Sequence, residues 1–156
     1  MDPEQLGLFL LKSNGAGYAG GDEKKWTRED DGSLTIVFGD GPWKSHDNFF
    51  GGEPYGGRTV VFHEGRSVWL LVYYGWVAQE SNPDQLYAVL RNALKQMPPA
   101  APYRGPERYG EGQFTYVNHW EGELGRFTGR EEIYEASKLT YQAEYAGGWV
   151  DQRQGV

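Results

Sequence analysis

Asp-Pro-Glu-Gln-Leu at residues 2–6 returns as Asn-Pro-Asp-Gln-Leu at residues 82–86, and this repeat decides how the rest of the chain is interpreted. The likeness resumes where Tyr-x-Gly-Arg at residues 55–58 matches Phe-x-Gly-Arg at residues 127–130. The spacing between matched residues changes only between presumed elements, as loop insertions in a duplicated unit would cause. The sequence therefore predicts two copies of one unit, residues 2–77 and residues 82–150.

Each copy begins with a helix signal. Asp2 and Asn82 stand where a helix N-cap accepts backbone hydrogen bonds, and each is followed by proline, which suits the first helical position. We expect the first helix to end near residues 13–15 and the second before residues 97–99, Met-Pro-Pro. Apolar residues of the second helix recur at helical spacing, at Leu86, Val89, Leu90, Ala93 and Leu94.

Three strand-like runs rich in β-branched and aromatic residues follow each helix, so the unit is predicted to be α-β-β-β. The expected fold is α+β, a pseudo-twofold duplication with a mainly antiparallel sheet and one helix per unit. A copy of about 70 residues supplies only a marginal core, so we expect one domain over residues 1–156 with a shared core. Residues 22–33 are predicted to be a charged insert, either a solvated loop or a hairpin tip, and residues 151–156 a frayed tail.

Composition excludes several functions. The formal charge of −7 and the pI near 5.0 argue against direct nucleic-acid binding, which needs a clustered basic surface. The mean hydropathy is low at −0.70, but aromatic residues make up 15% of the chain and indicate a folded core. No apolar run is long enough to span a membrane, and the N-terminus lacks a basic signal region, so we expect a cytoplasmic protein.

Two polar residues among aromatic ones are the foremost candidates for a site. Strand alternation places Asp47 beside Trp43 and Phe49, while Asn118 shares a face with Phe114, Tyr116 and Trp120. Such a carboxylate could act as a desolvated general base or could bind a ligand stacked on the rings. Alternatively, both residues satisfy backbone donors at a strand bend.

Other repeated polar residues are weaker candidates. Arg58 and Arg130 each follow a glycine and could clamp a carboxylate or phosphate, or could form an internal ion pair with Asp47 or with a glutamate in the second copy. Tyr73 and Tyr145 could present hydroxyls to a pocket or pack in the core.

No metal or nucleotide cofactor is expected. The chain has no cysteine, and its three histidines lack metal-ligand spacing. Ser-His-Asp at residues 45–47 is no catalytic triad, because neighbouring strand residues point to opposite faces. Gly-x-Gly-x-x-Gly at residues 15–20 follows a helix, whereas a dinucleotide-binding turn joins a strand to a helix.

The last strands of the two copies differ on one face. The first presents Val68, Leu70, Val72, Tyr74 and Trp76, whereas the second presents Thr140, Gln142, Glu144, Ala146 and Gly148. We expect an additional cover over the first, supplied by a second chain in a homodimer, by a ligand or by the insert.

Several distinctive motifs resemble those of one family. They are Phe-Leu-Leu-Lys at residues 9–12, Val-Tyr-Tyr-Gly at 72–75, Ala-Pro-Tyr-Arg-Gly-Pro at 101–106 and Gly-Arg-Glu-Glu-Ile-Tyr at 129–134. The chain resembles a bacterial domain-of-unknown-function family found alone or after a repressor-type helix-turn-helix. This resemblance implies an effector-sensing module and carries over no catalytic residues. No helix-turn-helix is visible here, which disfavours direct DNA contact.

The function that we expect is therefore a small-molecule-binding or effector-sensing domain with an aromatic pocket and few polar anchors. Two alternatives stay open: a small enzyme that uses Asp47 with a tyrosine as acid and base, and a homodimeric interaction module.

Overall fold

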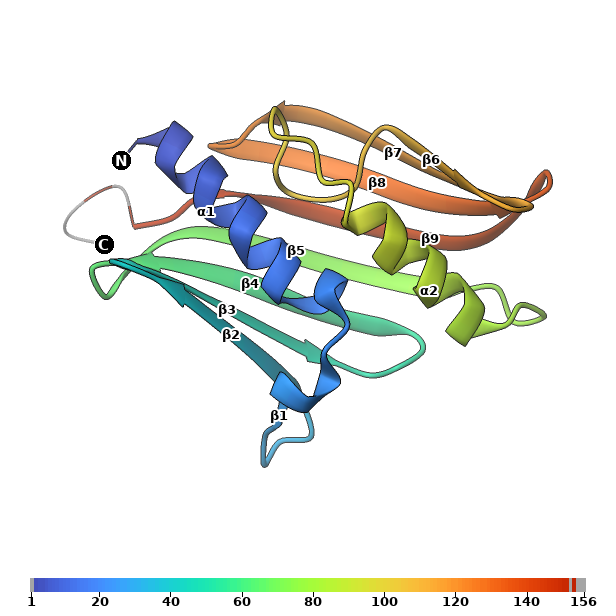
Figure 1. Ribbon diagram of the computed structural model, residues 1–156, viewed down its shortest axis with the longest axis horizontal. Coiled ribbons are helices and arrows are strands. Elements are labelled where there is room, and N and C mark those ends of the chain that lie inside the picture. The colour runs from blue at the N-terminus through green and yellow to red at the C-terminus, as the bar shows by residue number, and fades with distance from the viewer. Residues whose placement is uncertain (1, 152, 154–156) are drawn as a thin grey trace.

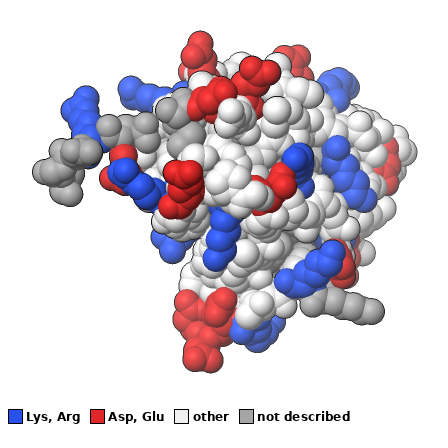
Figure 2. Space-filling model, turned by 60° about the vertical axis from the view of Figure 1, so that its left-hand side comes forward, with Lys and Arg blue, Asp and Glu red and all other residues white. Residues whose placement is uncertain are grey.

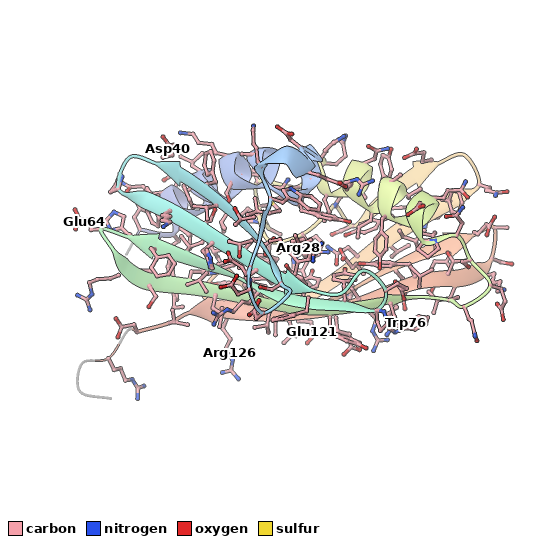
Figure 3. The ribbon with its side chains drawn as sticks, turned by 90° about the horizontal axis from the view of Figure 1, so that it is seen from below. Arg28, Asp40, Glu64, Trp76, Glu121 and Arg126 are labelled. Atoms are coloured by element: carbon pink, nitrogen blue, oxygen red, sulfur yellow. The ribbon has the colours of Figure 1, made fainter. Side chains whose placement is uncertain are left out.

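The computed structural model describes residues 2–151 and residue 153. The chain forms one nine-stranded antiparallel sheet with both α-helices on the same face (Figure 1). Figure 3 shows this from the side, with the helices above the sheet and none below it. The α+β class and the mainly antiparallel sheet are confirmed.

The elements follow one another in two similar runs. The first comprises α1 (Pro3–Ala16), the short 3-10 helices η1 (Tyr18–Gly20) and η2 (Glu23–Lys25), and strands β1 (Thr27–Arg28), β2 (Leu34–Asp40), β3 (Trp43–Phe50), β4 (Tyr55–His63) and β5 (Arg66–Val77). The second comprises α2 (Pro83–Leu94), β6 (Arg108–Glu111), β7 (Phe114–Glu123), β8 (Arg126–Glu135) and β9 (Lys138–Trp149).

The two runs meet at the middle of the sheet. The strand order is β1-β2-β3-β4-β5-β9-β8-β7-β6, so the two last strands pair with each other. The prediction of three strands per copy was wrong. Five strands follow α1, of which β1 is a short edge strand, and four follow α2. The polar strand β6 gave no alternating pattern; it forms because β7 pairs with its backbone.

The helix starts are confirmed. The Asp2 side chain accepts from the backbone of Glu4 at 2.9 Å, and Asn82 accepts from Asp84 at 3.0 Å. α1 continues to Ala16, slightly beyond its predicted end, where the backbone of Gly17 closes the last turn.

Residues from both runs share the core. Around α1, the ring of Trp69 stacks on Phe127 with centroids 5.7 Å apart, and the ring of Tyr103 stacks on Phe127 at 4.0 Å. Around α2, Leu86 and Leu90 pack in one cluster with residues of both runs, among them Ala19 and Tyr141. The core therefore joins the two halves in one layer between helices and sheet.

The insert forms a hairpin with β2, one of its two predicted forms, and its first residues also pack against the sheet. Residues 22–33 contain η2 and β1, and β1 pairs with β2 at the edge of the sheet. The ring of Trp26 stacks on Tyr18 and meets Phe49 edge to face, with centroids 5.8 Å and 5.7 Å away. The insert thus adds a wall on the helix side of the sheet, in addition to its charged tip.

The opposite face of the sheet is open. Val72 and Tyr74 are 43% and 57% exposed there, and no described segment covers them. The insert therefore does not supply the expected cover. Val68 is buried because a bulge between Val61 and Phe62 turns it toward the core. Most of the predicted tail, residues 151–156, lies outside the described residues.

Acidic and basic side chains are interspersed on the face that Figure 2 displays, with no extended basic patch. No helix of the described residues is long and apolar enough to cross a membrane.

Candidate functional site

A cavity of about 460 Å³ lies between the helices and the first half of the sheet. Strands β3, β4 and β5 line it with Asp47, Thr59 and Tyr73, and the loop after α2 adds Arg104. Exposed lining residues mark its opening at Glu23, Gly51, Gly52 and Asp84. The volume is in the range of small-molecule sites.

Asp47 is the polar centre of this cavity. Its Oδ1 atom accepts hydrogen bonds from Thr59 Oγ1 and from the Tyr73 hydroxyl, both at 2.8 Å. No described group donates to Oδ2, and the side chain keeps part of its surface accessible because it lines the cavity. One carboxylate oxygen is therefore held in place, and the other is available to an occupant.

Burial raises the pKa of Asp47 above its ordinary value, because the charged form loses water. The hydrogen bonds from Tyr73 and Thr59 and the charge of Arg104 oppose this rise. Burial and the neighbouring Asp47 carboxylate also raise the pKa of Tyr73, which keeps its proton and donates. Chemically, Asp47 can accept a proton or bind a hydrogen-bond donor.

Asn118 has a corresponding environment that is closed. Its Oδ1 accepts from the Tyr145 hydroxyl at 2.9 Å, as Asp47 accepts from Tyr73. Its Nδ2 donates to the Gly105 carbonyl at 2.9 Å. Asn118 is buried and does not line the cavity, and both of its side-chain polar atoms are paired within the protein.

A buried ion pair stands behind one cavity wall. Arg104 Nε donates to Glu131 Oε2 at 3.1 Å, and Arg104 Nη2 donates to Glu131 Oε1. The Glu131 side chain is 0% exposed and that of Arg104 only 11%. Tyr116 and Tyr141 also donate to Glu131, at 2.7 and 2.9 Å, so its carboxylate is fully satisfied.

Two tyrosines that line the cavity, Tyr55 and Tyr73, contact the residues of this ion-pair cluster. The Tyr55 hydroxyl lies 2.6 Å from that of Tyr141, and it must be the donor because Tyr141 donates to Glu131. The Arg104 guanidinium lies over the Tyr73 ring, 5.6 Å from its centroid. Burial lowers the pKa of Arg104, but Glu131 and nearby tyrosines outweigh this and leave it well above its ordinary value.

The loop between β3 and β4 forms part of the rim. Glu53 Oε1 accepts from the Val77 backbone at 2.6 Å, and Glu53 Oε2 accepts from the Tyr87 hydroxyl. Because Tyr87 belongs to α2 and Val77 ends β5, one carboxylate ties this loop to both.

Of the residues proposed from the sequence, the structure brings Asp47, Phe49 and Tyr73 together in the cavity. Trp43 stacks on Phe9 under α1, with ring centroids 5.5 Å apart. Four other residues proposed from the sequence are buried or half-buried in the core and do not line the cavity: Tyr116, Asn118, Trp120 and Tyr145.

Arg58 and Arg130 do not reach this site. Arg58 is exposed and faces away from the helices, so the predicted internal pair with Asp47 is wrong. Strand alternation is the reason, because Arg58 and Thr59 point to opposite faces of β4. Arg130 pairs with Glu144 at 2.9 Å, as a pair in the second copy was expected to, but both side chains are exposed.

Several site residues were missed from the sequence: Thr59, Tyr55, Arg104 and Glu131. Arg104 stands in the motif Tyr-Arg-Gly-Pro at residues 103–106, where an arginine directly before Gly-Pro could have indicated a fixed loop position. Glu131 is 27 positions away, and only the fold brings the two together. Among the described residues, no group of His, Asp or Glu has the arrangement of a metal site.

A family model described as Domain of unknown function (DUF5680) matches residues 47–150. The match begins at Asp47 and includes Arg104 and Glu131. No curated protein and no solved structure matches the chain.

Proposed function

The chain belongs to the DUF5680 family, a domain of unknown function, and we propose that it binds a small molecule in the cavity between its helices and β3–β5. The observation that carries this proposal is the Oδ2 atom of Asp47, which faces the cavity without a described donor. Oδ2 is open to the cavity, so an occupant that donates to it completes the hydrogen bonding of the carboxylate.

The surroundings of Asp47 support binding over a purely architectural role. Thr59 and Tyr73 hold Oδ1 in place, so the free oxygen is oriented before a ligand arrives. Aromatic walls supply apolar contact, and polar groups are few, as in sites that bury most of a ligand. An effector-sensing role follows if the ligand also changes the rim loop that Glu53 ties to α2 and β5.

Binding of prodan, a neutral fluorescent dye, tests the cavity itself. We expect its emission to rise and shift to the blue with the wild-type protein. Gly52→Trp should abolish this, because a Cβ at Gly52 meets no atom within 4 Å and a large ring there narrows the opening.

Gly110→Trp is the matched control. Gly110 also has open space for a Cβ, but it lies in β6, away from the cavity. Equal prodan binding by both variants would contradict the cavity as the site. Native mass spectrometry of freshly purified protein is the complementary measurement, with a retained small molecule as the expected result.

The likeness of the two halves fits an internal duplication in which only the first copy has a cavity beside the repeated polar residue. In the second half, Nδ2 of Asn118 donates a hydrogen bond to the Gly105 carbonyl in the loop, so both polar atoms of Asn118 are paired. In the first half Asp47 has a carboxylate instead and faces a cavity. Divergence of two copies, one structural and one for binding, accounts for this difference.

A second candidate function is homodimerisation through the open face of the sheet. Val72 and Tyr74 are exposed there beside Ala146, and an apolar strip of this kind can pair with itself about a twofold axis. Lys44 and Arg58 lie on one side of the strip. Glu121, Glu132 and Glu144 lie on the other, together with Arg130, which pairs with Glu144. Two copies packed face to face would bring the basic side of each over the acidic side of its partner.

Light scattering at micromolar concentration tests this association. We expect a dimer that Val72→Lys dissociates, while Leu8→Lys leaves it intact. Leu8 is a suitable control because it is 57% exposed but belongs to α1, on the other side of the sheet. A monomeric wild-type protein would contradict the dimer.

A further inference from the structure

The charges around the cavity do not balance. Arg104 is neutralised by Glu131 through two hydrogen bonds. Asp47 receives hydrogen bonds from hydroxyls alone, and none of the described side chains forms an ion pair with it. The cavity therefore contains a carboxylate that has no ion-pair partner among the described residues, and a cationic occupant would neutralise it.

The rim adds to this negative character. Glu23 and Asp84 line the opening, where Arg91 is the basic lining residue. The Arg91 guanidinium already lies over the Tyr18 ring, 5.7 Å from its centroid. A cation approaching the opening meets an excess of acidic groups, in keeping with the net charge of −7 for the whole chain.

The geometry of the carboxylate selects among cations. Oδ1 of Asp47 already accepts two hydrogen bonds, so a guanidinium could not take both oxygens in its bidentate arrangement. An ammonium group is a compact charge that needs only one oxygen. Oδ2 alone fits such a donor.

Aromatic rings complete the recognition of a cation. Trp26, Phe49 and Tyr55 line the cavity together with Tyr73. Ring faces attract an ammonium group and also hold the apolar body attached to it. The rings of Tyr55 and Tyr73 are 6.0 Å apart and tilted, at the wall that carries Asp47's hydrogen-bond partner.

From these contacts we infer that the ligand is an organic ammonium ion, a protonated primary amine on an aromatic or apolar body, with its nitrogen on Asp47 Oδ2. This inference rests on the proposed binding function and narrows it to one chemical class. Asn118 shows the alternative arrangement, in which the chain itself supplies the partner of the second polar atom through Gly105.

Three probes of similar size distinguish the charge of the ligand: phenethylamine, phenethyl alcohol and phenylacetate. Calorimetric titration at neutral pH should give at least about tenfold tighter binding of the amine than of the alcohol, with the acid weakest, because a buried ion pair replaces a neutral hydrogen bond. Phenethylguanidine should bind more weakly than phenethylamine. The wild-type protein alone provides this comparison, without any variant.

Asp47→Asn should bring the affinities of amine and alcohol to within about twofold of each other, since the amide carries no charge. Glu64→Gln is the matched control, because it removes one negative charge from an exposed side chain in the turn between β4 and β5, outside the cavity. It should leave the preference for the amine unchanged.

The outcomes separate this inference from the proposed function. If prodan binds and Gly52→Trp blocks it, but phenethylamine has no advantage over the alcohol, the ammonium assignment fails and the binding site stands. Tighter binding of phenylacetate would overturn the assignment in favour of an anionic ligand at Arg104. If neither prodan nor any of the phenethyl probes binds, the proposed function fails and the inference with it.

Discussion

Tyr73 and Tyr145 lie directly opposite each other where β5 pairs with β9, and each donates its hydroxyl to a residue two strands away. Tyr73 reaches Asp47 on β3, and Tyr145 reaches Asn118 on β7. In each case the residue paired with the tyrosine on the intervening strand is a glycine, Gly57 or Gly129. The same hydrogen bond thus occurs on both sides of the sheet centre, with a carboxylate in one half and an amide in the other.

Replacing Asp47 by asparagine should separate stability from binding. The amide can still accept from Tyr73 and Thr59, as Asn118 accepts from Tyr145. It removes a desolvated charge, so we expect the variant to melt at the same or a higher temperature at neutral pH while losing the preference for the amine. Parallel loss of melting temperature and binding would assign Asp47 an architectural role.

The pH dependence of the same variant has a definite sign. Burial raises the folded pKa of Asp47 above its ordinary value of 3.8, so the wild-type protein loses this contribution to stability as the pH rises through the folded pKa. The loss is about 1.4 kcal/mol for each pKa unit of the rise. The advantage of Asp47→Asn in urea denaturation should therefore grow from acid to neutral pH.

Tyr73, His46 and Arg104 are the titratable or charged groups that influence Asp47. They are unchanged in the Asp47→Asn variant, so the difference between the two proteins reports the carboxyl group itself. A difference independent of pH would show that the Asp47 pKa is not raised.

The reciprocal change, Asn118→Asp, should destabilise the fold. It places a carboxylate against the Gly105 carbonyl and removes the donor that the carbonyl accepts from. The unpaired carbonyl alone costs about 1 to 3 kcal/mol, and burial of the new charge adds to this. Urea denaturation at neutral pH measures the effect; stability equal to the wild-type protein would mean that water or a movement of the loop replaces the lost bond.

Gly129→Ala should break the hydrogen bond between Tyr145 and Asn118. A Cβ at this position would lie 2.2 Å from Cζ of the Tyr145 ring, so the ring has to move. We expect a loss of about 2 kcal/mol or more, since the change combines overpacking with a lost buried hydrogen bond. Gly110→Ala, which has open space for its Cβ, is the control and should change stability much less.

Arg104→Met should be strongly destabilising, because it leaves the fully buried Glu131 carboxylate without its cation. Removal of one partner of a buried pair costs about 3 to 5 kcal/mol. Adding Glu131→Gln should recover part of this loss, since the amide oxygen still accepts from Tyr116 or Tyr141. A double-mutant cycle in urea measures the coupling, and strictly additive losses would contradict it.

The local features of the fold could be predicted because they depend on short stretches of sequence. The caps at Asp2 and Asn82 follow from side chains that reach backbone donors two residues ahead. Strand β6 and the edge strand β1 could not be predicted, because short polar strands depend on pairing with neighbours for their hydrogen bonds.

The candidate site was predictable in part. Alternation along β3 correctly placed Asp47 and Phe49 on the same face, and Trp43 is on that face too. Their separation into a cavity and a packed cluster depends on where α1 crosses the sheet, because Phe9 takes the space beside Trp43. The pairing of Arg104 with Glu131 likewise depends on a loop position that no periodicity records.

By itself, the sequence determined that a helix precedes strands in each half, where the helices start and the face on which Asp47 lies, because caps and alternation act over a few residues. The tertiary structure alone decided that Asp47 opens onto a cavity while Asn118 is closed by Gly105. The physical reason is that the second polar atom of each side chain is paired or open according to which distant segment lies beside it. Those segments are positioned by packing across the whole sheet.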